Sequence, residues 1–336
     1  MERDGHEASG ITLVAAGATE VGKRRHNEDV VLVRQDLGFF LVADGAGGHN
    51  AGDVASALAA RSVSNYLGAT VRARDDEPEF DDFGLARDAR TLARAIRKAN
   101  RDIFEISRSH AEHRGMGTTV VAAFFSPHGG IMHVAHVGDS RCYRMREGNL
   151  ELLTQDHSLL TDVLEERPEL DNALLANLPR HAVTRALGMQ ENVRVEVRSY
   201  PVIDNDRFLL CSDGLSVPVS ASDLADTLDL DKPPGAIVQH LLNLANEAAG
   251  RDNIAVLIVD CTGGPETAIP PDPRARVPKP RPPARPSDPS QPELLLLGIE
   301  EIELTGGRPL QMVPQNSASD GLAQALAEFA RTKPPK

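Results

Sequence analysis

Short apolar runs recur along the first three quarters of the chain and are separated by Gly, Asp or Asn. They are rich in β-branched and aromatic residues, which is the composition of β-strands. We predict strands over 11–17, 29–35, 38–44, 118–126, 130–138, 141–146, 193–199, 207–212 and 253–260. Several of these follow one another with no helix between them, which favours antiparallel sheets with the helices grouped outside.

Two long segments carry apolar residues at helical spacing instead. We predict helices over 51–67 and 85–108, where Leu92, Ile96 and Ile103 recur on one face of the second. Shorter helices are expected over 222–228 and 235–249, and Ser222 and Asp223 are candidate caps for the first of these. The combination predicts an α+β domain.

The pattern divides the chain into three parts. Residues 10–261 are expected to form one folded unit, followed at 262–292 by a stretch dense in proline and mixed charge. We interpret that stretch as a linker with polyproline II character, and favour a plain spacer over a docking site for proline-reading modules. The tail, 293–336, holds a short strand-like and a short helical segment. Two alternatives stay open: it docks on the main domain, or it binds a protein partner.

Composition narrows the class of protein. The formal net charge of −13 is opposite to that of most nonspecific nucleic-acid binders, so no nucleic-acid partner is expected. Three cysteines without a C-x-x-C pair predict buried free thiols rather than a zinc site or a disulfide framework. No apolar run approaches the roughly 20 residues of a membrane span, and the N-terminus lacks an apolar signal core. We expect a cytoplasmic protein without a membrane partner.

Five aspartates give the strongest chemical signal. They stand in short polar segments beside apolar runs: Asp29, Asp44, Asp139, Asp213 and Asp252. Strands that end in this way deliver carboxylates to one end of a sheet, where the charges repel each other unless a cation joins them. Oxygen ligands without a Cys or His cluster are typical of magnesium or manganese. The residues alone therefore predict a metal-dependent hydrolase.

Seven motifs extend this interpretation. They occur in the order RRHNEDVVLV, LVADGAGGHNAGDVAS, GMGTTVVAA, HVGDSRCY, TQDHS, FLLCSDGLS and GRDNIAVLIV. In this order and spacing the chain resembles the bacterial branch of the protein phosphatase 2C family, the metal-dependent Ser/Thr phosphatases, over roughly three quarters of its length. The resemblance implies a four-layer αββα sandwich, in which two antiparallel sheets lie between helical layers.

The resemblance also implies a pair of divalent cations, manganese or magnesium. Asp44 is then expected to bridge the two ions, and the backbone carbonyl of Gly45 to add an oxygen to one of them. Asp213 and Asp252 are expected to complete the shell of the other ion. Taken singly, an Asp in an Asp-Gly pair is often only a turn residue, but the set of matching positions favours the metal site.

Three further residues receive roles from the same resemblance. Glu28 and Asp29 are expected to act mainly through metal-bound waters. Arg24, four residues before Glu28, matches the phosphate-binding arginine, whose planar guanidinium grips two oxygens at once. The adjacent Arg25 is interpreted as an exposed charge. Arg24 is thus the predicted substrate-binding residue, and Arg24 and Asp44 are the predicted catalytic residues.

The chain departs from the family at two positions. Asp139 matches a ligand of a third metal site, but the Asp that usually completes that site is replaced by Val217, so a weak or absent third ion is expected. The residue after the Asp-Gly pair is Ala46, where many eukaryotic members carry a His that acts as general acid. Two alternatives stay open for protonation of the leaving group, a metal-bound water or a nearby His. For His49 a structural role is favoured over that one, His157 is interpreted as structural, and 159–181 is expected to form a flap beside the site.

The favoured prediction is a protein Ser/Thr phosphatase that acts on phosphoproteins, as the opponent of a bacterial Ser/Thr kinase. The alternative is a weakly active or inactive family member that acts as a regulatory adaptor through its C-terminal tail. Val217 and the extra segment motivate that alternative. The retained acidic residues and Arg24 argue against it, because a scaffold has no need of them.

Overall fold

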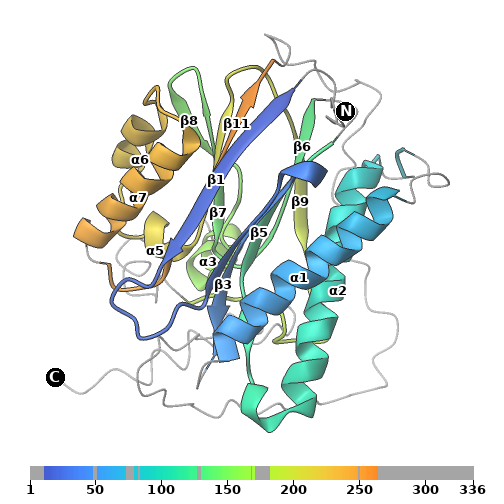
Figure 1. Cartoon of the computed structure of the whole chain (residues 1–336). Coiled ribbons are helices and arrows are strands. Elements are labelled where there is room, and N and C mark those ends of the chain that lie inside the picture. The colour runs from blue at the N-terminus through green and yellow to red at the C-terminus, as the bar shows by residue number, and fades with distance from the viewer. Residues whose placement is uncertain are drawn as a thin grey trace, which may run out of the picture.

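The computed structural model describes residues 11–47, 51–72, 79–81, 84–126, 130–167, 169–170, 182–248 and 250–263. Within these ranges two antiparallel sheets are packed face to face and flanked by helices (Figure 1). The expectations for His49, for the flap segment 171–181 and for residues 264–336, which include nearly all of the linker and the whole tail, lie outside the described residues.

The larger sheet has the strand order β2 (Asp29–Arg34), β3 (Phe39–Ala46), β5 (Val120–Phe125), β6 (Ile131–Val137), β9 (Glu196–Pro201), and the short β4 (Gly117–Thr118) pairs with β3. The smaller sheet has the order β1 (Thr12–Glu20), β11 (Ile254–Thr262), β10 (Arg207–Cys211), β7 (Arg141–Arg146), β8 (Asn149–Leu152). The pairs between these strands are antiparallel, for example β2 with β3 and β10 with β11.

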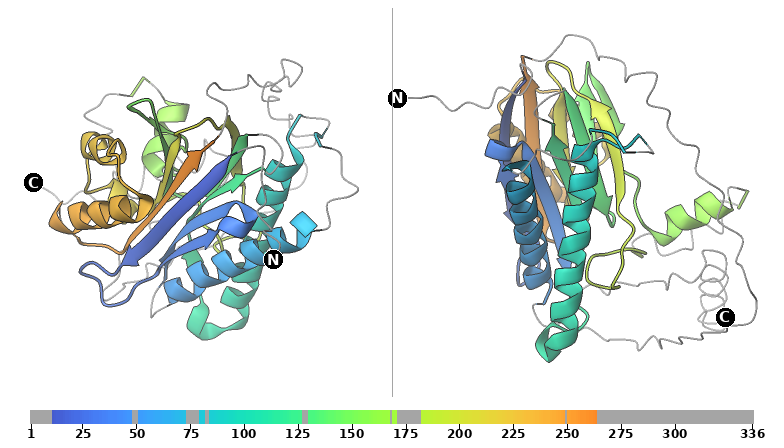
Figure 2. Two further views of the ribbon diagram at one scale, coloured as in Figure 1. Left: turned by 45° about the horizontal axis from the view of Figure 1, so that its top comes forward. Right: turned by 90° about the vertical axis from the view of Figure 1, so that its right-hand side faces the viewer.

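Helices form the two outer layers. The long helices α1 (Ala51–Arg72) and α2 (Arg87–Ser109) cover the larger sheet, and α5 (Asp213–Ser216), α6 (Ala221–Leu228) and α7 (Pro234–Ala248) cover the smaller one. Helix α3 (Leu159–Glu166) stands away from the sandwich in the right-hand view of Figure 2. Two 3-10 turns, η1 (Gln35–Leu37) and η2 (Ala111–His113), complete the described elements.

The central strands are buried on both faces, which explains why their sequences are continuously apolar. In β3, Phe39 and Leu41 pack into the core shared with α1 and α2. The alternate residues Phe40 and Val42 pack into the core between the two sheets. A shift of one residue in register would exchange these two sets, so the buried pattern specifies how β3 is paired.

The predicted four-layer αββα sandwich of the α+β class is confirmed by this arrangement. The expected caps of α6 are wrong: Ser220 caps the helix, and its hydroxyl accepts a hydrogen bond from the Asp223 backbone N–H at 3.1 Å. Ser222 therefore lies in the first turn. Strand β8 was not predicted, because its sequence, NLEL, is too short and mixed to carry a period-two signal.

The three cysteines are buried free thiols, as predicted. Among the described residues, no helix is long and apolar enough to cross a membrane. One consequence of the antiparallel pairing matters most for function. It brings the ends of β3, β6 and β10 to the same end of the sandwich as the starts of β2 and β11, and the five aspartates flank or occupy those positions.

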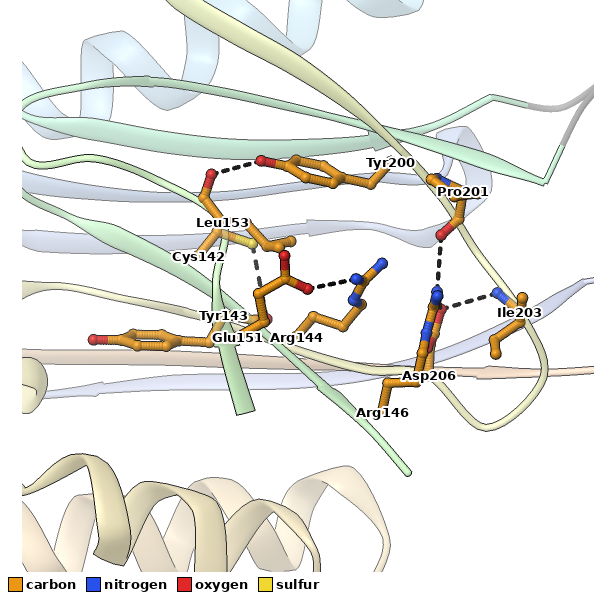
Figure 3. Close-up of polar contacts among 10 residues, drawn as sticks. All are labelled: Cys142, Tyr143, Arg144, Arg146, Glu151, Leu153, Tyr200, Pro201, Ile203 and Asp206. Atoms are coloured by element: carbon orange, nitrogen blue, oxygen red, sulfur yellow. Dashed lines mark hydrogen bonds and ion pairs between the residues drawn. The ribbon is translucent and has the colours of Figure 1, made fainter. Parts of the chain in front are cut away.

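The opposite end of the sandwich is held together by ion pairs and hydrogen bonds (Figure 3). Arg146, at the far end of β7, bonds Asp206 through both Nε and Nη2 at 2.6 Å and also donates to the carbonyl of Pro201 on the other sheet. Farther from this end, the Tyr200 hydroxyl donates to the Leu153 carbonyl at 2.8 Å. These contacts join the two sheets.

Candidate metal centre

The site begins with a pair of opposed aspartates. Asp29, the first residue of β2, lies directly opposite Asp44 near the end of β3. The backbone of Asp44 is fixed by Thr118 and Thr119, whose hydroxyl and backbone N–H respectively each donate to its carbonyl at 2.8 Å. Thr118 and Thr119 thus fix the backbone that carries the central carboxylate.

Gly45 follows Asp44 in a space that no side chain could share. A Cβ at this position would lie 2.1 Å from the carbonyl oxygen of Gly52 and 2.7 Å from that of Glu28. The Gly45 N–H donates to the Glu28 carbonyl at 3.1 Å. Glycine here lets the start of α1 and the segment before β2 close around the Asp44 backbone.

Asp29 carries an unsatisfied oxygen. Its Oδ2 accepts a hydrogen bond from the Ser212 hydroxyl at 2.8 Å, but its buried Oδ1 has no hydrogen-bond partner. Ser212 in turn accepts the Ala255 N–H at 2.9 Å, so this serine ties β10, β11 and β2 together. A buried carboxylate oxygen without a partner costs free energy unless a cation or a proton satisfies it.

Burial and neighbouring carboxylates raise the pKa values of Asp29 and Asp44. Burial raises the pKa of Asp29 to about 8, and the charges of Asp213 and Asp252 add to the shift. Burial, followed by the charge of Asp29, raises the pKa of Asp44 well above its ordinary value. Asp139 also acts on Asp44 in the same direction. The structure therefore brings the other four aspartates within electrostatic range of Asp44.

Asp252 and the next residue organise the loop that precedes β2. Arg24 donates from Nη2 to Asp252 Oδ2 at 2.9 Å, and both side chains are about one quarter exposed, at 23% and 26%. The Asn253 side chain accepts the Glu28 N–H at 2.9 Å and donates to the carbonyls of Val21 and His26.

Sequence reasoning missed both Asn253 and Ser212. Each directly neighbours a predicted ligand, in the Asp-Asn and Ser-Asp-Gly pairs, and this adjacency was the only available signal.

Glu28 sits between Arg24 and the start of α1. Burial raises its pKa, the charge of Asp53 adds to the shift, and the charge of Arg24 opposes it. A Cβ on Gly52 would lie 2.8 Å from Glu28 Oε2, so the N-terminal turn of α1 is in contact with this carboxylate. Glu28 thus lies at the rim of the acidic end, next to the predicted phosphate-binding guanidinium.

Asp139 follows a tightly restrained glycine. Gly138 has φ +111°, and a Cβ there would lie 2.5 Å from the Thr119 side chain. The Gly138 backbone N–H donates to His157 Nδ1 at 3.1 Å, and the Gly138 carbonyl accepts the backbone N–H of His157 at 2.9 Å. Val217 stands where the Asp that usually completes the third site would be, and it is 52% exposed just after α5.

A second group of metal-ligand types lies behind this loop. One ligand atom each from His136, His157 and Glu196 lies within 4.8 Å of the other two. The hydrogen bonds argue against an ion: His157 Nδ1 accepts the Gly138 N–H, so its Nε2 carries the proton that points at Glu196. That contact is the largest cause that lowers the pKa of Glu196 to about 2. This group is a buried hydrogen-bonded cluster.

The acidic end fits a pair of hard divalent cations. It offers carboxylate oxygens from separate strands and a buried oxygen without a partner, and no Cys or His side chain joins its described residues. Oxygen-only donors favour magnesium or manganese over zinc or copper. Cations at this place, together with the water bound to them, would satisfy Asp29 Oδ1 and offset the mutual repulsion of the carboxylates.

Comparison with known proteins gives one consistent answer. The family model described as protein phosphatase 2C matches residues 16–255. The Ser/Thr phosphatase Stp of Listeria welshimeri is 35% identical over 241 residues, which cover 70% of this chain and 91% of that protein. The Ser/Thr protein phosphatase PstP of Mycobacterium tuberculosis is 34% identical over 254 residues, 74% of this chain and 46% of that one.

A solved structure agrees with these relatives. The crystal structure of the catalytic domain of the Ser/Thr protein phosphatase PstP in complex with two manganese ions aligns with a TM-score of 0.62 and 30% identity. The alignment covers 75% of this chain and 99% of that one.

Proposed function

The chain belongs to the protein phosphatase 2C family and is a metal-dependent Ser/Thr protein phosphatase, and on that premise we propose that two divalent cations at the acidic end of the sandwich serve its reaction. The observation that carries the proposal is the convergence of Asp29 on β2, Asp44 on β3 and Asp213 at the start of α5, with one buried oxygen left unsatisfied. Such a cluster is stable when cations occupy it.

The chain's own groups divide the work of holding the ions. Asp44 is proposed to bridge them, with the Gly45 carbonyl on one ion and Asp213 and Asp252 on the other. Glu28 and Asp29 border this set and would act mainly through water bound to the ions. When present, the cations supply Lewis acidity, which activates water and shields the negative charge of a phosphate monoester.

Arg24 is proposed to bind the phosphoryl group of the substrate. It is partly exposed at the rim, and its bond to Asp252 aims the guanidinium toward the carboxylates. The loop that carries it is held by Asn253, so the guanidinium is positioned before substrate arrives. A planar fork of N–H donors matches two phosphoryl oxygens, which a lysine could not match in the same way.

A third ion is proposed to bind weakly or not at all. Asp139 lies close enough to act on Asp44, but the position that would supply the complementary carboxylate is the exposed Val217. Valine offers no donor atom. With Ala46 after the Asp-Gly pair, no His is available at that position for leaving-group protonation.

The substrates are proposed to be phosphoproteins made by a Ser/Thr kinase, and the compartment a reducing cytoplasm, which the three buried free thiols support. The adaptor alternative is not favoured, because the relatives are Ser/Thr phosphatases. A partner for the tail remains a prediction, since residues 293–336 lie outside the described part of the chain.

Metal counting and phosphate release test the proposal together. We expect dialysed full-length protein to take up two Mn²⁺ ions tightly, as measured by calorimetry and elemental analysis. The loaded protein should release phosphate from phosphoserine and phosphothreonine peptides, and chelator should abolish the release. Uptake of a single ion at full activity would overturn the dinuclear arrangement, and metal-independent release would overturn the metal mechanism.

A further inference from the structure

A cavity outside the acidic centre lies at the C-terminal end of α2, the lower end of that helix in Figure 1. It has a volume of about 420 Å³, and its walls include Phe104, Ser107, Arg108 and Arg114. The backbone at Gly115 contributes to the lining as well. None of these residues takes part in the metal centre described above.

Two arginine side chains without an ion pair among the described residues line the cavity. Neither Arg108 nor Arg114 forms an ion pair within the part of the chain that the structure describes, and both are exposed. The Arg108 guanidinium lies over the Phe104 ring, with its carbon 5.5 Å from the ring centroid, which limits its freedom. Helix α2 carries seven basic and three acidic residues, whereas the chain as a whole has a net charge of −13.

The floor of the cavity is built by close backbone packing. The Gly115 N–H donates to the Ser107 hydroxyl oxygen at 3.0 Å. Gly188, which also lines the cavity, has φ +85°, and a Cβ there would lie 2.3 Å from the Ile103 side chain. A side chain at that position would disturb the packing of the loop on α2. The two guanidiniums therefore border a formed depression and do not extend from a flat surface.

The cavity is connected to the metal centre by a short stretch of chain. Gly115 is three residues before Thr118, so their Cα atoms are at most about 11 Å apart. The Thr118 hydroxyl donates to the Asp44 carbonyl at 2.8 Å. An extended peptide advances about 3.3 Å per residue, so a segment bound at the metal centre can reach the cavity within a few residues.

We propose that this cavity binds a second anionic side chain of the phosphoprotein substrate, about three to five residues from the phosphoserine or phosphothreonine that is hydrolysed. The ligand chemistry is a carboxylate or a second phosphoryl group, held by the guanidinium of Arg108, that of Arg114, or both. The inference rests on the proposed function and adds a substrate class to it: phosphosites in acidic or multiply phosphorylated segments.

Three sets of peptides test the proposal with the Mn²⁺-loaded full-length protein. Each contains one phosphothreonine and carries Glu, phosphoserine or Ala at one of the positions three, four or five residues to either side. We expect kcat/KM to be about tenfold higher for at least one acidic position than for Ala, a factor that corresponds to about 1.4 kcal/mol. Equal rates for the acidic and Ala peptides at every position would overturn the proposal.

Matched double variants locate the preference. Arg108→Gln with Arg114→Gln should remove it, whereas Arg97→Gln with Arg101→Gln, exposed on the same helix outside the cavity, should keep it. Retention in the first pair would overturn the assignment of the cavity. Arg108→Glu with Arg114→Glu should favour peptides with Lys at the same position, a gain that a merely misfolded protein could not show.

A small substrate separates this inference from the proposed function. p-Nitrophenyl phosphate has no second anionic group, so its hydrolysis should be unchanged in both double glutamine variants. Failure of wild type to hydrolyse either p-nitrophenyl phosphate or any peptide would refute the proposed function itself. Hydrolysis of all substrates without an acidic preference would refute only the role of the cavity.

Discussion

The two ends of the sandwich handle buried carboxylates in opposite ways. At one end burial and neighbouring carboxylates raise the pKa values of Asp29 and Asp44, and one oxygen of Asp29 has no hydrogen-bond partner. At the other end the side chain of Asp206 is fully buried, yet both of its oxygens bond Arg146 (Figure 3). The same strands connect the two ends.

The difference shows which carboxylates serve stability and which serve chemistry. A buried acid that is fully bonded by an arginine and a backbone N–H contributes to a fixed structure. A cluster of acids without enough cations lowers the stability of the protein that contains it. Such a cluster persists because the binding of a ligand offsets that loss. We therefore expect opposite effects on stability when a carboxylate charge is removed. At the acidic end the metal-free protein should stay as stable or become more stable, and at the other end its free energy of unfolding should fall.

The largest expected effect is on catalysis at the acidic end. Asp44→Asn removes the proposed bridging charge, so kcat/KM for a phosphopeptide should fall by about a thousandfold or more, which corresponds to about 4 kcal/mol. The same change should leave the metal-free protein as stable as wild type or more stable, because it relieves repulsion. Phosphate release and chemical denaturation in chelator measure the two quantities. A variant that is both inactive and strongly destabilised would contradict the comparison.

The converse change is made at the other end of the sandwich, where Asp206 pairs with Arg146. Asp206→Ala leaves Arg146 without its partner and should lower the free energy of unfolding by about 3 kcal/mol. Below the unfolding temperature the metal-loaded variant should keep wild-type kcat. Asp36→Ala is the matched control, since Asp36 pairs with Arg34 where both side chains reach solvent, and its loss should cost less than about 1 kcal/mol. Equal losses of stability for the two variants would show that burial of the pair is unimportant.

The stability of the metal-free protein should depend on pH through its acidic end. The pKa of Asp29 is raised from an unfolded value near 4 to about 8, so its stabilising contribution is present at low pH and is lost as the pH rises through this window. The free energy of unfolding in chelator should therefore fall between pH 5 and pH 8. Asp29→Asn should flatten that dependence. A flat wild-type profile, measured by urea titration, would be evidence against the repulsive cluster.

Saturating Mn²⁺ should restore the stability that the metal-free protein loses as the pH rises. At a hundred times its dissociation constant a bound ion stabilises the folded state by about 2.7 kcal/mol. The gain should be larger at pH 8 than at pH 5, where protons compete for the same oxygens. Asp206→Ala should show the same gain as wild type, because its site lies at the other end.

Substitution of Arg24 tests substrate binding at the acidic end separately from the chemical step. Arg24→Ala should raise KM by roughly tenfold to a hundredfold, the range expected for charge-assisted hydrogen bonds, and lower kcat less. The adjacent exposed Arg25→Ala serves as the control and should change neither. A large loss of kcat at unchanged KM would mean that Arg24 acts on the transition state rather than on binding.

The sequence was most informative where local pattern and chemistry coincide. Phe39–Ala46 could be predicted as a buried strand that ends in an acid, because its apolar run and its Asp-Gly pair are contiguous. The convergence of Asp29 with Asp44 depends on pairing register, which no single segment encodes. Asn253 and Ser212 were missed for the same reason: their partners, at Glu28 and Asp29, are about two hundred residues away in the sequence.

The smallest expected effect concerns the position that departs from the family. Val217 is 52% exposed, and its N–H bonds the Asp213 carbonyl at 2.9 Å, so a carboxylate there meets solvent rather than core. Val217→Asp should change the free energy of unfolding by no more than about 0.5 kcal/mol. It should nevertheless raise the number of tightly bound Mn²⁺ ions from two to three, with Asp139 as the second carboxylate. Val217→Asn, similar in size but uncharged, should stay at two, and wild type that already binds three ions tightly would show that the missing Asp is not needed.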